Sequence, residues 1–368
     1  MVFHNEMNMD SYESFINLVR LGIGHSANAI SGTVDWSEVK AFAERQGLSA
    51  VVLDGIEALR SQDPSTVSLP ERQMLTHWIG EVLQGYEFRY ELYANTIGEM
   101  AKFYNGHGFR MMVLKGYACS LDWPTPEHRP TGDIDIWLFG RQKEADATLA
   151  AERGVAIDNS HHHHTLFPWN DFMVENHYDF INIYHHKSHV EFEKILKEFG
   201  GEDSYYTELL GERVWLPSPN LHALFLMKHL MLHFSSGVVN FRQLLDWGFF
   251  VRRHGKEVDW ERIDSVFEKF RMKELYGIFN AICVEDLGFD ASAFSFVNSD
   301  TLLKQRVVND IRCPRFAGEM PSAFFPRLAF KLRRWHANIW KHKLCYRDSL
   351  WSAFWYGLWG HLIRPGSL

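Results

Sequence analysis

The spacing of apolar and polar positions changes twice along the chain. Over the first hundred residues it is helical, and it predicts helices over residues 11–21, 35–46 and 69–104. In the last of these, Trp78, Ile79, Val82 and Leu83 recur at helical intervals, and Asp35 is a suitable N-cap for the second. The chain is therefore expected to begin with a helical region.

From residue 106, short apolar runs bounded by turn residues replace the helical spacing. They predict strands over residues 109–114, 133–138, 165–167, 172–177 and 180–184. Helical segments over 116–121 and 142–152 lie between them. This middle part is expected to mix helices and strands.

Helical spacing returns after the break at Pro217-Ser218-Pro219 and predicts helices over residues 221–234, 241–254, 260–270 and 273–287. Three further prolines precede a last segment over residues 327–362. We expect an α+β protein in which a small mixed-sheet domain, residues 106–216, is flanked by helical regions 1–105 and 217–325. Residues 326–368 form a separate basic, Trp-rich segment.

Composition narrows the class of protein. With 368 residues, 46% hydrophobic residues and a net charge of -8, the chain is long enough for a large core, and nucleic-acid binding by the whole protein is disfavoured. The four cysteines form no Cys-x-x-Cys pair, which disfavours a zinc ribbon or a disulfide framework. We find no secretory signal and no apolar stretch long enough to span a bilayer, so we expect a cytoplasmic protein.

The charge is unevenly distributed. Residues 326–368 carry eight Lys and Arg against one Asp, a net charge of +7, which leaves -15 for the rest of the chain. Five tryptophans lie in the same segment. The pattern is compatible with a helix packed on the acidic body, with peripheral contact to a membrane surface, and with a nucleic-acid patch.

Four common catalytic motifs are absent from the sequence. It contains no Gly-x-x-x-x-Gly-Lys-Ser/Thr, no Gly-x-Gly-x-x-Gly after a strand, no His-Glu-x-x-His and no Gly-x-Ser-x-Gly. Their absence disfavours four classes of protein: P-loop, Rossmann, zincin and α/β-hydrolase.

A pair of carboxylates on one predicted strand is the strongest chemical signal. Asp133 and Asp135 alternate with Ile134 and Ile136, so both carboxylates point to one face of the strand. Like charges at that spacing favour a bound cation, and oxygen ligands suit Mg2+ or Mn2+ completed by substrate phosphates. The alternative is an ordinary solvated strand.

A second group of residues could contact phosphate. The strand over 109–114 leads directly into Lys115 and Gly116, at the start of a predicted helix. Glycine permits close approach of the backbone to a ligand, and Lys115 supplies a positive charge. Arg129 could clamp a phosphate, or it could pair with Glu127 or Asp133.

These residues resemble a known superfamily. A strand, a glycine at a helix start and an Asp-x-Asp on the next strand are similar to the nucleotidyltransferase fold of the DNA polymerase beta type. The form Leu114-Lys115-Gly116, followed by Arg129 and Asp133-Ile134-Asp135, resembles an uncharacterised bacterial nucleotidyltransferase family, over residues 109–246. The chain departs from the superfamily pattern at Tyr117, where a Gly or Ser is usual.

The resemblance implies metal-dependent transfer of a nucleoside monophosphate from an NTP to an acceptor, with release of pyrophosphate. The acceptor could be a small molecule, a glycan precursor or a protein. The resemblance also implies a third carboxylate on a neighbouring strand, and Glu175, in the sequence Glu175-Asn176-His177, is the best match. Asp179 and Glu191 are alternatives, as is a merely structural role for Glu175.

Histidines suggest two further features. The run His161–His164, with His177, His185 and His186 nearby, is compatible with a transition-metal site or with a polar strand lining a pocket. Because residues of an extended strand alternate between faces, one ion could reach all four only if the run bends. His229 and His233 share a helical face, and we expect them at a helix surface or in packing.

Two other functions remain open. A catalytically silent relative would bind a nucleotide or a partner protein without turnover. A membrane-associated scaffold of a biosynthesis cluster would use the basic C-terminal segment.

Overall fold

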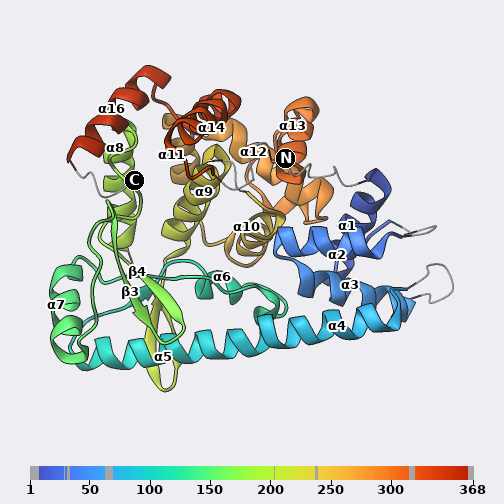
Figure 1. Ribbon diagram of the computed structural model, residues 1–368, viewed down its shortest axis with the longest axis horizontal. Helices are drawn as coiled ribbons and strands as arrows, with labels where there is room; N and C mark the ends of the chain where they lie inside the picture. Colours follow the sequence, from blue (N-terminus) through green and yellow to red (C-terminus); the bar gives the residue numbers. More distant parts are fainter. Residues whose placement is uncertain are drawn as a thin grey trace.

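The computed structural model describes residues 8–28, 30, 34–62, 69–202, 204–236, 239–314 and 320–363. Its N-terminal part is helical, as predicted: α1 (Met9–Gly22), α2 (Trp36–Gln46), α3 (Ser49–Gln62), α4 (Arg72–Val82) and α5 (Arg89–Gly106). A π-helical turn, Leu83–Phe88, joins α4 to α5, so the two form one long rod along the lower edge of Figure 1. Helix α3 was not predicted.

A six-stranded mixed sheet lies in the middle of the chain. Its strands are β1 (Met112–Val113), β2 (Ile134–Trp137), β3 (His164–Trp169), β4 (Phe172–His177), β5 (Tyr205–Leu209) and β6 (Glu212–Leu216), in the spatial order β3-β4-β2-β1-β6-β5. β2 runs parallel to β4 and β1 parallel to β6, and the other neighbours are antiparallel. The predicted α+β class is confirmed.

Two short elements and two longer helices connect these strands. They are α6 (Tyr117–Ser120), a 3-10 turn (Pro126–His128), α7 (Gln142–Arg153) and α8 (Lys187–Gly200). The predicted helices over 116–121 and 142–152 are therefore confirmed in their essentials, whereas α8 was not predicted.

Some predicted strands were wrong. Residues 180–184 form bends instead of a strand, because the backbone N–H groups of Phe180 and Ile181 donate to the carboxylate of Glu193 on α8. Of the strand predicted over residues 109–114, only the two residues of β1 form a strand. The hairpin β5–β6 was missed because its residues are largely exposed and give no strong apolar signal.

The remaining helices follow β6, and the predicted positions of the first four are confirmed. They are α9 (Pro219–Ser236), α10 (Phe241–His254), α11 (Trp260–Lys269), α12 (Lys273–Ala281), α13 (Thr301–Arg312), α14 (Phe324–Ala337), α15 (Ile339–Cys345) and α16 (Leu350–Ile363). A π-helical turn (Ile282–Asp286) and a 3-10 turn (Ala291–Ala293) connect α12 to α13. The last segment, expected over 327–362, is divided into three helices.

Alternation along β1 directs neighbouring side chains into two different cores. Val113 packs with Tyr93 and Ile97 of α5, the helix at the lower edge of Figure 1. Met112 and Leu114 belong to the second core, which continues through α8, α9 and the C-terminal helices. The sheet is thus covered on both faces, and the domain boundaries proposed above stay a prediction.

The basic C-terminal segment packs on the body only in part. In α15, Trp340 lies edge-on to Phe234, and Nζ of Lys341 lies 2.5 Å from Asp310. Trp335, Trp351, Trp355 and Trp359, by contrast, are exposed. Arg364 lies outside the described residues. No helix in the described ranges is both long enough and apolar enough to cross a membrane.

Candidate active site

Asp135 and Glu175 face each other across neighbouring strands. They occupy paired positions in the parallel ladder between β2 and β4, so their carboxylates lie on the same face of the sheet. Ile134 and Ile136 point to the opposite face, into the core beneath α5, as the alternation predicted. Asp135 is only 2% exposed, so it is not a solvated strand position.

His177 lies between the two carboxylates. Its Nε2 is 3.1 Å from Oδ1 of Asp135 and 3.4 Å from Oε2 of Glu175. Burial alone would lower the pKa of His177, but the hydrogen bonds to Asp135 and Glu175 outweigh it and raise this pKa to about 9. Without a bound metal, the imidazole is therefore a cation at neutral pH.

Lys115 adds a second positive charge. It follows β1, which is joined to β2 by the N–H of Leu114 donating to the carbonyl of Asp135. Nζ of Lys115 lies 2.9 Å from Oδ1 of Asp135. Burial would lower the lysine pKa, but the charges of Asp135 and Glu175 outweigh it and raise this pKa, so the ammonium stays charged.

Asp133 lies just before β2 and is exposed. Partial burial, together with the charges of Glu175 and Asp135, raises the pKa of its carboxyl group. It lines the same cavity as Asp135, as their predicted common face requires, but it does not belong to the tight cluster of Asp135, Glu175 and His177. Its backbone carbonyl accepts a hydrogen bond from Tyr93 on α5, at 3.0 Å.

Gly116 adopts a conformation that favours glycine. Its φ is 60°, and a Cβ atom at this position would lie 2.4 Å from the hydroxyl oxygen of Tyr93. The predicted helix that follows is the single turn α6. Gly116 therefore fits the close turn between Lys115 and α6, beside the loop that carries Asp133.

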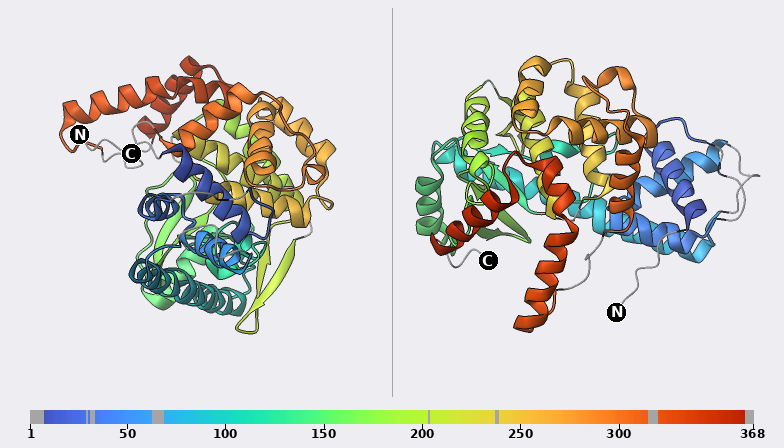
Figure 2. Two further views of the ribbon diagram at one scale, coloured as in Figure 1. Left: turned by 90° about the vertical axis from the view of Figure 1, so that its right-hand side faces the viewer. Right: turned by 90° about the horizontal axis from the view of Figure 1, so that it is seen from above.

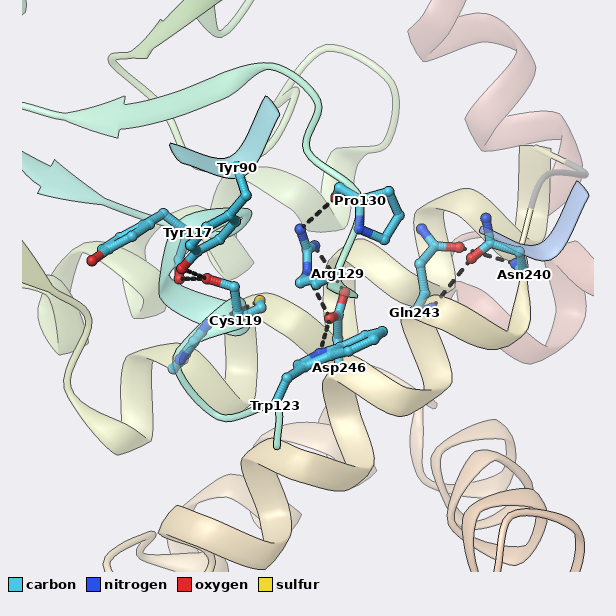
Figure 3. Close-up of polar contacts among 11 residues, drawn as sticks. Tyr90, Tyr117, Cys119, Trp123, Arg129, Pro130, Asn240, Gln243 and Asp246 are labelled. Carbon is cyan, nitrogen blue, oxygen red and sulfur yellow. Dashed lines mark hydrogen bonds and ion pairs between the residues drawn. The ribbon is translucent and has the colours of Figure 1, made fainter. Parts of the chain in front are cut away.

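Arg129 is buried and forms a bidentate ion pair with Asp246 of α10 (Figure 3). The Nε–Oδ1 and Nη2–Oδ2 distances are 2.7 and 3.0 Å, and Trp123 donates to the same carboxylate. Of the two sequence interpretations, the ion pair is present, but the predicted partners, Glu127 and Asp133, were wrong. An acid 117 positions away cannot be recognised by local spacing.

A capping box fixes the start of helix α10, which carries Asp246. Asn240 and Gln243 form a reciprocal capping box at its N-terminus, also drawn in Figure 3. Because that box fixes the first turn, Asp246 is presented to Arg129 from the second turn. The loop before β2 and helix α10 thereby form one side of a common cavity.

This cavity, of about 210 Å³, lies between the ends of β1 and β2 and helices α9 and α10. Nine of its lining residues have charged or polar side chains: Lys115, Arg129, Asp133, Asp135, His229, His233, Arg242, Gln243 and Asp246. His229 and His233 share a helical face as predicted, and that face looks into the cavity, with their Nε2 atoms 2.8 Å apart. Burial lowers the pKa of both rings, that of His233 to about 4.

Arg242 was missed by sequence reasoning. It is half-buried, lines the cavity, and its Nε has no hydrogen-bond partner among the described residues. Only its position one residue into a predicted helix could have pointed to it. The alternatives to Glu175 lie elsewhere: Asp179 pairs with Lys197, and Glu191 pairs with Lys269 and Arg347.

The histidine run bends just before β3. His163 and His164, with His177, form a second cluster whose ligand atoms lie within 4.8 Å of one another. Burial lowers the pKa of His163 to about 2 and that of His164 to about 4, so both rings are neutral. His161, His185 and His186 do not belong to the cluster.

The donor atoms fit a divalent cation. One oxygen each from Asp135 and Glu175 and one nitrogen from His177 lie within 4.8 Å of one another, which is the spacing that a shared ion requires.

A family model described as an uncharacterised nucleotidyltransferase matches residues 32–287. The chain belongs to this family. The match covers the sheet, the cavity and helices α9 and α10, so it supports nucleotidyl transfer in general as the activity of this nucleotidyltransferase. Comparisons with curated proteins and with solved structures give no match.

Proposed function

We propose that this nucleotidyltransferase moves a nucleoside monophosphate from an NTP to an acceptor, releases pyrophosphate, and depends on a divalent metal. The single observation that carries the proposal is the pairing of Asp135 with Glu175 across β2 and β4, beside Lys115. A buried and a half-buried carboxylate at this spacing need cations, and a metal–triphosphate complex supplies one.

Asp133, Asp135 and Glu175 would hold Mg2+ or Mn2+. When bound, the metal would neutralise charge at the α-phosphate and orient the leaving pyrophosphate. Burial alone would raise the pKa of Glu175, but His177 and Lys115 outweigh it and lower this pKa. A carboxylate with a lowered pKa is a good ligand and a weak base, so we assign Glu175 to the metal in preference to proton removal from the acceptor.

Cations around the cavity would bind the triphosphate. Lys115 stands beside Asp135 and adds a point charge, and Gly116 lines the same cavity, where its backbone would meet the phosphate. Arg129 uses three of its five N–H donors on Asp246 and Pro130, which leaves two for a phosphate. Arg242, with its unpartnered Nε, is a further candidate.

The acceptor would bind beside α9 and α10. These helices line the cavity together with the strand ends that carry Asp133 and Asp135, so their side chains are placed to select the acceptor. We propose a small molecule, a glycan precursor or a protein as the acceptor.

The test is transfer of label from NTPs labelled at the α-phosphate, with Mg2+ and candidate acceptors, the protein itself included. Asp135→Asn should lower transfer by at least about 100-fold, the scale on which loss of one preorganised charge acts. Glu208→Gln, which changes an exposed carboxylate on β5, is the matched control and should leave the rate unchanged. Equal transfer by wild type and Asp135→Asn would overturn the mechanism, and tight NTP binding without turnover would favour the silent relative.

A further inference from the structure

In a straight strand, neighbouring histidines would point to opposite faces and could not share a metal ion. The run His161–His164 is not straight, because it bends just before β3. The carbonyl of His163 accepts hydrogen bonds from the N–H groups of Tyr178 and Asp179, at 3.0 and 3.1 Å. This contact turns the chain immediately before β3, where His164 pairs with His177 across the ladder. Two successive histidines therefore approach the same ring.

The three rings lie close together and two of their nitrogens are unused. Ring centroids are 4.4 Å apart for His163–His164, 5.6 Å for His163–His177 and 5.3 Å for His164–His177. Nδ1 of His163 and Nδ1 of His164 are buried and have no hydrogen-bond partner in the described part of the chain. Buried polar atoms of this kind usually have a partner, so a ligand is implied.

We propose that His163, His164 and His177 bind one transition-metal ion of the Zn2+ class, next to the carboxylate of Glu175. Nδ1 of His164 lies 3.9 Å from Oε2 of Glu175, and an ion about 2 Å from each atom fits between them. Imidazole nitrogens favour Zn2+, Co2+ and similar ions, whereas Mg2+ prefers oxygen. The site does not depend on the proposed transfer reaction.

The test uses chelator-treated full-length protein titrated with Zn2+ or Co2+, with binding followed by equilibrium dialysis and by the visible absorption of Co2+. Wild type should bind one ion at this site. His163→Ala and His164→Ala should each weaken binding by at least about 10-fold. His161→Ala, in the same run but outside the cluster, is the matched control and should change it by less than about 3-fold.

Further arms keep the proposal falsifiable if a variant misfolds. Millimolar Mg2+ should leave Zn2+ bound to wild type, because oxygen-preferring Mg2+ competes poorly for imidazoles. Asp133→Asn should retain Zn2+ binding even if it loses transfer, which separates this site from the proposed reaction. Absence of stoichiometric binding, displacement by Mg2+, or equal weakening by His161→Ala would overturn the proposal.

A separate observation concerns α14, which projects from the body in both views of Figure 2. Leu328, Leu332 and Trp335 recur along one side of it and are 45%, 58% and 51% exposed. The helix also carries four cations, Arg327, Lys331, Arg333 and Arg334, and no acidic residue.

We infer that α14 lies on an anionic lipid surface. Charge decides between lipid and an α14–α14 contact with a second copy of the chain, because two copies of a helix with four cations would repel, whereas acidic headgroups attract it. The exposed Leu and Trp side chains would enter the interface.

The test is cosedimentation of the full chain with phosphatidylcholine vesicles, with and without roughly 30% phosphatidylglycerol. Wild type should sediment only with the anionic vesicles. Leu332→Ser/Trp335→Ser should lower the bound fraction by about 5-fold or more, whereas Leu302→Ser, at an even more exposed position on α13, should not. Binding to neutral vesicles alone, no binding, or dimerisation in its place would overturn the inference.

Discussion

Asp135 and Glu175 are directly paired across the parallel strands β2 and β4, and both are held by one histidine nitrogen. Two carboxylates in this position repel each other unless a cation lies between them. His177 is that cation in the metal-free protein, and Lys115 flanks it. The same arrangement that prepares a metal site therefore also requires positive charge for the fold to be stable.

Replacing His177 by Ala should destabilise the metal-free protein by about 3 kcal/mol, because it leaves the buried Asp135 and the half-buried Glu175 short of a partner. Urea unfolding in the presence of a chelator measures the loss. His77→Ala, at an exposed helical position, should change stability by less than about 0.5 kcal/mol. Added Mg2+ should restore part of the stability of the His177 variant, and an unchanged unfolding midpoint without metal would contradict the assignment.

The Arg129–Asp246 pair gives a second stability prediction. Arg129→Met should cost about 3–5 kcal/mol, since it leaves a buried carboxylate unpaired. The double variant Arg129→Met/Asp246→Leu should lose clearly less than Arg129→Met alone, as a denaturant double-mutant cycle would show. Arg141→Met, which breaks an exposed pair with Glu144, should cost far less than Arg129→Met. Purely additive single effects would argue against a coupled pair.

The effects of substitutions at Gly116 and Tyr93 should be coupled through a steric contact. Gly116→Ala should destabilise the protein by at least about 2 kcal/mol, because a positive φ and a contact with the Tyr93 hydroxyl oppose a Cβ atom. Tyr93→Phe removes that hydroxyl, at a cost of about 1 kcal/mol for the lost hydrogen bond. The double variant should be more stable than the sum of the single effects implies. Thermal melts of wild type, the two single variants and the double variant measure this coupling. Additive losses of stability would show that the close contact is unimportant.

Glu193 should make stability depend on pH. Burial raises its pKa to about 7. The N–H groups of Phe180 and Ile181 donate hydrogen bonds to the carboxylate and oppose this rise, but burial outweighs them. The folded state therefore retains a proton that the unfolded state has lost, so stability should fall as pH rises from about 4.5 to 7, by up to about 3 kcal/mol.

Glu193→Gln should flatten this dependence. Glu198→Gln, at an exposed position of the same helix, is the control and should follow wild type. Parallel pH profiles for wild type and Glu193→Gln, measured by urea unfolding, would show that Glu193 does not titrate in this range.

Local spacing was sufficient for those parts of the fold whose apolar pattern is strong. Helices α1, α2, α4, α5 and α9 to α12 bury one face or most of their surface, and alternation along β2 correctly separates Asp135 from Ile134 and Ile136. The hairpin β5–β6 could not be recognised in this way, because exposed residues such as Tyr205 and Glu208 carry no burial signal.

Sequence reasoning also placed Lys115, Asp133, Asp135 and Glu175 in one region, and the structure brings them around one end of the sheet. It could not identify Asp246 as the partner of Arg129, because long-range pairing depends on how α10 packs. Nor could spacing show that the histidine run bends. That bend depends on hydrogen bonds from Tyr178 and Asp179, on the far side of the β3–β4 hairpin.

The separation of Arg129 from Asp246 also bears on how the protein is made. At ordinary translation speeds, on the order of ten seconds pass between synthesis of the arginine and synthesis of an acid 117 positions later. Throughout that time the loop before β2 has no anchor on α10. A nascent chain that stops short of α10 would thus carry the carboxylates of β2 and β4 but lack one wall of the cavity.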